Sequence, residues 1–172
     1  ADSSSLMPIG PLALSEALIE ELIRADTVVL GAPMYNFGMP AQLKAYFVQI
    51  VRVGRTFGFD PGASEPYRPL LTSKPVVVVV SVGDGSLLPG GALAHLNFLE
   101  PHLRTILAFI GLTDVTLVRA GYDEYGDDRA KRSLTAAEAA IDQVLDDVVR
   151  SSRSVVARQL ASCRSLEPAL MS

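Results

Sequence analysis

Three short apolar runs, each with an amphipathic helical stretch after it, constrain the fold of this chain more than any other feature. The runs are Thr27 to Gly31, Pro75 to Ser81 and Asp114 to Ala120, and all three are rich in β-branched residues. Segments of this kind are typical of parallel strands, and the uncharged first run predicts a central strand covered on both faces. The alternation of strands and helices predicts an α/β fold with helices on both faces of a parallel sheet.

Four stretches show the apolar spacing of a helix. They are residues 15–25, the segment that follows Pro40, the segment from Leu99 to Ile110 before Gly111, and the segment from Ala137 to Val148. Residues 55–73 are rich in Gly and Pro and are expected to form a long loop that covers something. We expect a single domain over residues 1–150 and a C-terminal tail over residues 151–172.

Composition excludes several classes of protein. The net charge of −4 and the pI of about 5.1 argue against a general nucleic-acid binder. A lone cysteine, Cys163, cannot form an internal disulfide, so a reducing cytoplasm is expected. It also makes no metal cluster with the two distant histidines, His95 and His102. The longest apolar run, PVVVVVSV, is too short to span a bilayer.

The turn after the first strand, GAPMYNFGMP, is the strongest candidate site. Ligands on parallel sheets bind at the carboxyl ends of strands, beside the switch point in strand order. Met34, Tyr35 and Phe37 place apolar surface there, and Asn36 adds a hydrogen-bond donor and acceptors. This mixture suits a planar ring with a polar edge, such as a flavin. The alternative interpretation is that the three large side chains pack under neighbouring helices.

A second turn, SVGDGS at residues 81–86, follows the next strand. Its glycines would allow a ligand to approach the backbone closely. The alternative is an ordinary turn in which Asp84 or Ser86 caps a helix. The segment matches neither a dinucleotide fingerprint nor a phosphate-binding P-loop.

Three segments carry a resemblance to a known family. APMYNFGMPAQLKAYF followed by RVGRTF, and later LRTILAFIGLTDV, resemble the FMN-dependent NAD(P)H-quinone oxidoreductases called azoreductases. The resemblance implies a flavodoxin-like three-layer α/β/α fold, a homodimer, NADH or NADPH as hydride donor, and quinones or azo compounds as acceptors. It implies that the flavin ring is lined by Pro33, Met34, Tyr35, Asn36, Phe37 and Gly38, and that Ser81, Val82, Gly83 and Asp84 close on its pyrimidine side.

The chain departs from the family in two places. Val82 and Asp84 stand where the family has Arg and Gly, and a carboxylate beside the ring would disfavour the anionic reduced flavin. The three strands also correspond to the third, fourth and fifth of a 2-1-3-4-5 sheet. No strand with a phosphate loop is recognised before Ser15. Either the sequence shown lacks its N-terminal part, or the domain is a degenerate relative that binds flavin poorly. We favour the first and expect a domain that lacks its first two strands here, with an unpaired edge where the first strand belongs.

The sequence leaves rival functions open. The favoured hypothesis is the flavin-dependent oxidoreductase, in which the flavin carries the chemistry and no side chain is named as acid or base. A flavodoxin-like interaction or oligomerisation module without flavin is the alternative, and a one-electron flavodoxin carrier is the third. Other aromatic residues could border a pocket or simply pack, namely Phe57, Phe59 and Tyr67 in the long loop and Tyr122 and Tyr125 after the last strand.

Overall fold

Three parallel strands form the central sheet in the order β1–β4–β5. The computed structural model describes residue 10 and residues 12–166, and the side chains of these up to residue 150. The strands are β1 (Val28–Pro33), β4 (Val76–Val82) and β5 (Val115–Gly121), and the helices are α1 (Ala13–Arg24), α2 (Ala41–Ile50), α3 (Leu99–Ile110) and α4 (Asp128–Leu166). Short 3-10 turns lie at Gly85–Leu87, Ala94–Leu96 and Asp123–Tyr125.

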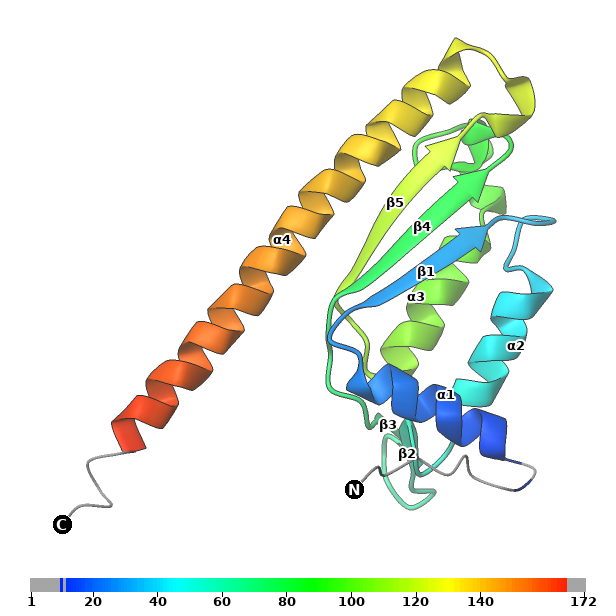
Figure 1. Cartoon of the computed structure of the whole chain (residues 1–172). Helices are drawn as coiled ribbons and strands as arrows, with labels where there is room; N and C mark the ends of the chain where they lie inside the picture. The colour runs from blue at the N-terminus through cyan, green and yellow to red at the C-terminus, as the bar shows by residue number, and fades with distance from the viewer. Residues whose placement is uncertain (1–9, 11, 167–172) are drawn as a thin grey trace.

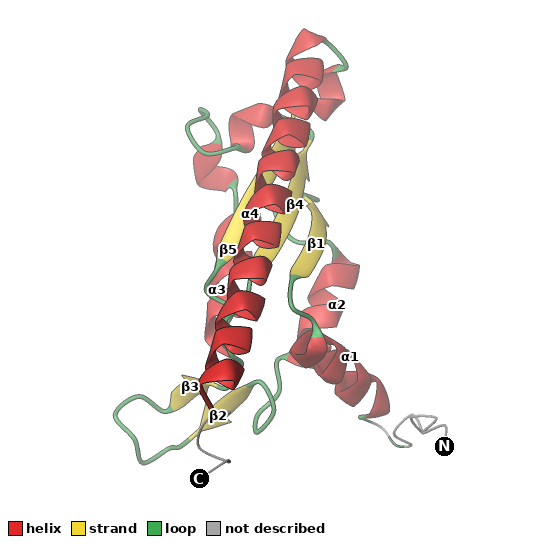
Figure 2. Cartoon of the chain, turned by 60° about the vertical axis from the view of Figure 1, so that its left-hand side comes forward, coloured by secondary structure: helices red, strands yellow, loops and turns green. Residues whose placement is uncertain are grey.

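The helices form two layers on opposite faces of the sheet (Figure 1). Helices α1, α2 and α3 pack on the face to which Val76, Val78 and Val80 point. Helix α4 covers the other face, where Val77 and Val118 contact Ala137 (Figure 2). This α/β arrangement confirms the predicted parallel sheet with helices on both faces, and every predicted strand and helix is present.

Strand β1 is an edge strand within the described residues, which is the unpaired edge expected where the first strand of the family's sheet belongs. Its partner is β4, with Val28 opposite Val76, and the side chain of Val29 is 68% exposed. An apolar groove runs between β1 and α4, lined by residues that include Val79 and Leu145. The run of β-branched residues correctly indicated a strand with two apolar faces, but it carries no information about which neighbours are present.

The predicted long loop contains an antiparallel hairpin of β2 (Phe57–Phe59) and β3 (Tyr67–Pro69). Its aromatic side chains pack together, since the Phe57 and Tyr67 rings lie 4.8 and 5.7 Å from the ring of Phe109 on α3. The hairpin lies at the amino-terminal end of the sheet strands (Figure 1). Within this chain, Phe57, Phe59 and Tyr67 therefore do not border the candidate site, and the packing interpretation holds.

Helix α4 continues past the predicted boundary of the tail. It runs to Leu166 and so includes most of the range 151–172 that was expected to be a tail. The physical reason is local: residues 151–166 contain neither Gly nor Pro, so no residue in that range ends the helix. Among the described helices, none is both long enough and apolar enough to cross a membrane.

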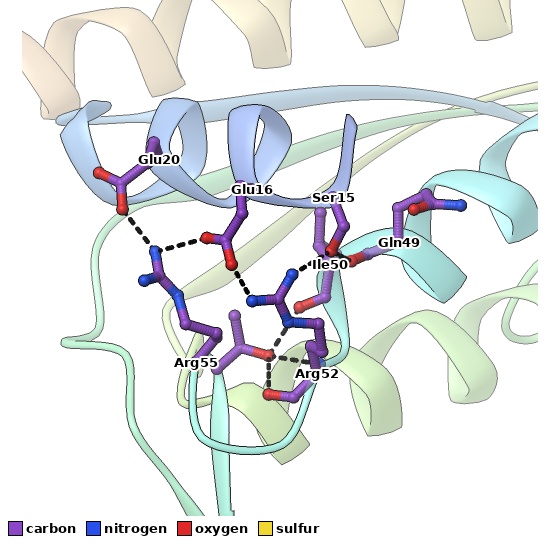
Figure 3. Close-up of polar contacts among 8 residues, drawn as sticks. Ser15, Glu16, Glu20, Gln49, Ile50, Arg52 and Arg55 are labelled. Carbon is purple, nitrogen blue, oxygen red and sulfur yellow. Dashed lines mark hydrogen bonds and ion pairs between the residues drawn. The ribbon is translucent and has the colours of Figure 1, made fainter. Parts of the chain in front are cut away.

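A polar cluster joins α1 to the end of α2 (Figure 3). The Ser15 hydroxyl donates to a backbone carbonyl of α2 at 2.7 Å and accepts a bond from Arg52 at 3.0 Å. Glu16 pairs with both Arg52 and Arg55, and Arg55 also pairs with Glu20. The guanidinium of Arg55 is therefore engaged by α1, so it holds two helices together and does not face the candidate site.

Candidate functional site

The two candidate loops meet at the carboxyl edge of the sheet, as the topology predicts. The backbone N–H of Met34 donates to the carbonyl of Ser81 at 2.8 Å, which ties the first loop to the second. The N–H of Phe98, just before α3, donates to the carbonyl of Phe37 at 3.0 Å. The start of α3 therefore lies against the first loop, and three segments far apart in sequence form one continuous surface.

The first loop contains a tight turn with strained backbone. Tyr35 and Gly38 exchange two backbone hydrogen bonds, of 3.1 and 3.0 Å. The two central residues, Asn36 and Phe37, have φ angles of +48° and +67°. Positive φ is common for Asn but costly for a bulky residue such as Phe, and turns of this kind normally carry Gly there. The backbone strain at Phe37 is therefore a feature that the surrounding structure must hold in place.

The aromatic side chains of this turn point outward. Tyr35 is 61% exposed and Phe37 is 47% exposed. The interpretation in which they pack under neighbouring helices is therefore wrong for these two residues, although it holds for Met34, which packs against the core. Asn36 is exposed, and its side chain makes no hydrogen bond with the described part of the chain. The turn thus offers apolar rings and a free amide side by side.

Phe98 is a third exposed aromatic residue at this edge, and it was not predicted from the sequence. Its side chain is 61% exposed, and its backbone is bonded to Phe37. The available signal was its place directly before the apolar stripe of α3, outside the spacing that buries Leu99 and Leu103. An apolar residue that does not fit its helix stripe is a candidate for a surface contact.

The second loop packs against its own chain. A Cβ atom on Gly83 would lie 2.3 Å from the carboxylate of Glu124, and one on Gly85 would lie 2.3 Å from the ring of Tyr122. The missing side chains of these two glycines therefore make room for the turn after β5. The prediction that the backbone of the loop lies against a ligand concerns its other side and stays a prediction. Asp84 caps the following 3-10 turn, accepting a bond from the N–H of Ser86 at 2.9 Å.

Other predicted members of the second loop differ in what they present. Ser81 is exposed. The side chain of Val82 is 2% exposed and belongs to the core, so only its backbone is available to a ligand. The position at which the family carries Arg therefore contributes to packing in this chain.

The carboxylate of Asp84 is held in its charged form. The backbone N–H of Ser86 keeps the pKa of Asp84 below its usual value, and the Tyr125 hydroxyl and Arg129 lower that pKa further. Arg129 lies over the rings of both Tyr122 and Tyr125, with its guanidinium carbon 5.2 and 4.2 Å from the ring centres. These two tyrosines, predicted as possible rim residues, therefore lie beside the second loop.

A partly buried ion pair supports the far end of the second loop. The carboxylate of Glu100, at the start of α3, binds the guanidinium of Arg119 on β5 through bonds of 2.9 and 2.7 Å. This pairing raises the pKa of Arg119 above its ordinary value. Asn97 joins the pair, because its amide donates to both Glu100 and the carbonyl of Leu87. The loop is therefore fixed at both ends.

The sequence and the fold match known proteins. Residues 7–145 match a family model described as flavodoxin-like fold. The chain belongs to this flavodoxin-like family. An FMN-dependent NADH:quinone oxidoreductase from Opitutus terrae is 58% identical over 145 residues, which cover 84% of this chain and 68% of that protein. An FMN-dependent NADH:quinone oxidoreductase 2 from Idiomarina loihiensis is 43% identical over 128 residues, covering 74% of this chain and 53% of that protein.

Solved structures support the flavodoxin-like fold. The azoreductase from Bacillus anthracis str. Sterne has a TM-score of 0.68 at 24% identity, with 77% of this chain and 62% of that chain covered. The azoreductase AzrA has a TM-score of 0.68 at 21% identity, with 83% of this chain and 69% of that chain covered. The chain thus spans between about half and about two thirds of the length of these four proteins.

Proposed function

We propose that the protein is an FMN-dependent oxidoreductase that passes hydride from NADH or NADPH to quinones or azo compounds. Its flavodoxin-like relatives include proteins named FMN-dependent NADH:quinone oxidoreductase and, at 43% identity, one named FMN-dependent NAD(P)H:quinone oxidoreductase 1. The observation that carries the proposal is the strained, outward-facing Tyr35–Gly38 turn at the carboxyl edge of the sheet. Exposed aromatic side chains beside an unused amide have no role in the core, but they suit a flat heteroaromatic ligand.

The residues of the turn divide into apolar and polar contacts for the ring of FMN. Tyr35 and Phe37 supply flat apolar surface, and Met34 supports it from the core side. The free amide of Asn36 can donate to and accept from the polar edge of the ring. Ser81 is exposed and its carbonyl is bonded to Met34, and we propose that Ser81 and the backbone of residues 82–84 complete the cradle.

The chemistry of the reaction belongs to the cofactor when it is bound. Bound FMN would supply hydride transfer between a nicotinamide and a second substrate. The chain contributes orientation, apolar contact and exclusion of water, so no side chain is assigned as general acid or base. The part of FMN beyond its ring is not assigned to any described residue.

Assembly and location complete the proposal. We expect a homodimer in the cytoplasm, with small-molecule substrates and no nucleic-acid or membrane partner. The single cysteine fits a reducing compartment, and the net charge of −4 does not favour binding to nucleic acid.

The proposal is tested on full-length purified protein by titration with FMN, followed through the fluorescence of the flavin, and by assay of NADH or NADPH oxidation with a quinone. Saturable binding and steady turnover are expected. Protein that neither carries nor takes up FMN, and shows no turnover, would instead support the flavin-free interaction module. A well-populated semiquinone in a redox titration, without quinone turnover, would support the one-electron carrier.

A further inference from the structure

The three exposed aromatic rings at the carboxyl edge of the sheet have no ring partner within the described part of the chain. Tyr35 and Phe37 belong to the turn after β1, and Phe98 directly precedes α3. By contrast, the ring of Phe57 in the hairpin packs on that of Phe109 at 4.8 Å. The aromatic surface at the carboxyl edge is therefore available to a ligand, whereas that of the hairpin is partly used by the chain itself.

The backbone of Phe98 is tied directly to the strained turn. Its N–H donates to the carbonyl of Phe37 at 3.0 Å and lies 3.1 Å from the carbonyl of Leu96. The Phe98 side chain is nevertheless 61% exposed and does not belong to the core cluster. Two open phenyl groups therefore start from neighbouring points of the surface.

The residues on both sides of Phe98 are fixed by buried polar contacts. The Asn97 side chain is buried, and its amide donates to the carbonyl of Leu87 at 3.2 Å and to Glu100 at 3.3 Å. The N–H of Glu100 donates back to the Asn97 side chain at 3.1 Å, and the Glu100 carboxylate binds Arg119. This network holds the start of α3 in place and leaves the ring of Phe98 outside the packed region.

The place of Phe98 relative to the proposed flavin cradle suggests its ligand. The cradle consists of residues 33–38 and 81–84, and Phe98 lies outside both segments, against the carbonyl of Phe37. A substrate that takes hydride from a flavin must lie against the flavin ring, because hydride transfer requires close approach. A substrate broader than one ring then extends beyond the cradle, where the exposed Phe98 ring can stack on it.

We propose that Phe98 is a specificity-determining residue that stacks on the part of an aromatic hydride acceptor extending beyond the flavin cradle. This inference rests on the proposed function and narrows its substrate class. Quinones of two fused rings and azo compounds with an aromatic ring at each end gain this contact, whereas a single-ring quinone does not reach it. Binding of FMN does not depend on Phe98.

The first experiment measures the binding of menadione, a quinone of two fused rings, to the oxidised FMN-loaded protein without nicotinamide, through the change in flavin absorbance. Phe98→Ala is expected to weaken this binding about tenfold, since stacking on an aromatic side chain contributes roughly that much to affinity. Phe98→Tyr keeps the ring and is expected to restore the affinity. Leu134→Ala, which truncates an exposed side chain of α4, is the control and should leave it unchanged. Unchanged menadione affinity in Phe98→Ala would overturn the proposal.

The second experiment compares menadione with para-benzoquinone, a single-ring quinone, in turnover at saturating NADH. Phe98→Ala is expected to raise KM for menadione about tenfold and to leave KM for para-benzoquinone and the dissociation constant of FMN unchanged. Equal rises in KM for both quinones would show a merely structural role for Phe98. Weaker binding of FMN would place Phe98 in the cradle, and either result would overturn the proposal.

The wild-type protein separates the two levels of the account. If it neither takes up FMN nor oxidises NADH, the proposed function fails and this inference fails with it. If the wild type turns over both quinones and Phe98→Ala behaves identically, the proposed function stands and only the role of Phe98 is refuted.

Discussion

Replacing Leu103 with alanine is expected to lower the free energy of unfolding by about 2–5 kcal/mol. Leu103 lies on α3 with no exposed surface, in the cluster that joins the three helices of one layer to β4. Truncation to alanine removes apolar contacts and leaves a cavity that the closely packed surroundings fill only in part. Chemical denaturation followed by circular dichroism measures the change as a lower midpoint with an unchanged slope.

Leu14→Ala is the matched control for this substitution. Leu14 lies on α1 and is exposed, so the same chemical change is expected to alter stability by no more than about 0.5 kcal/mol. Similar losses for Leu103→Ala and Leu14→Ala would contradict the arrangement of the core given above.

Replacing Phe37 with glycine is expected to weaken FMN binding about tenfold while it leaves the fold as stable as before. Stacking of an aromatic side chain on a flat base is worth about 1–3 kcal/mol, and tenfold in affinity corresponds to about 1.4 kcal/mol. Glycine relieves the left-handed backbone strain at φ +67°, which costs about 1–2 kcal/mol. The gain is offset in part by the greater freedom of glycine in the unfolded chain, about 0.5–1 kcal/mol.

The dissociation constant of FMN and the free energy of unfolding should be measured on the same preparations of Phe37→Gly and of Leu134→Ala. Leu134 is an exposed apolar residue of α4, so its truncation controls for the general loss of apolar surface and should change neither quantity appreciably. A loss of more than about 2 kcal/mol of stability in Phe37→Gly would show that Phe37 is a structural residue. Unchanged FMN affinity would show that it does not contact the ring.

Local sequence patterns predicted the main helices and strands, because these patterns and the elements they indicate depend mostly on residues close together in the chain. The apolar spacing in α3 and the left-handed Gly111, with a φ angle of +106°, define both ends of that helix. The apolar pattern of Val28–Pro33 could not show the edge position of β1, since a strand with two apolar faces looks the same beside one neighbour or two. The unpaired edge was expected from the resemblance to the family instead. The hairpin at residues 57–69 was also missed, because strands of three residues show too little alternation to be recognised.

Some features of the candidate site could be predicted from the sequence and others could not. The position of the GAPMYNFGMP turn at the carboxyl end of a strand followed from topology. The left-handed conformation of Asn36 and Phe37 could not be predicted, because Asn-Phe lacks the glycine that usually indicates such a turn. The contacts of Gly83 and Gly85 with the turn after β5 were not predicted for a third reason. A glycine permits close approach, but the sequence does not say that Glu124 and Tyr122 are among the groups that approach. Contacts between distant segments decide such questions.

Hydrogen exchange with and without FMN tests the cradle at the carboxyl edge most directly. The full-length protein should be exchanged in D₂O at several FMN concentrations and its peptides resolved by mass spectrometry. We expect FMN to slow amide exchange in residues 33–38 and 81–84, while the hairpin of β2 and β3 at the opposite end of the strands stays unchanged. Saturable FMN binding with no protection of residues 33–38 would contradict the assignment of that turn as the site of the flavin ring.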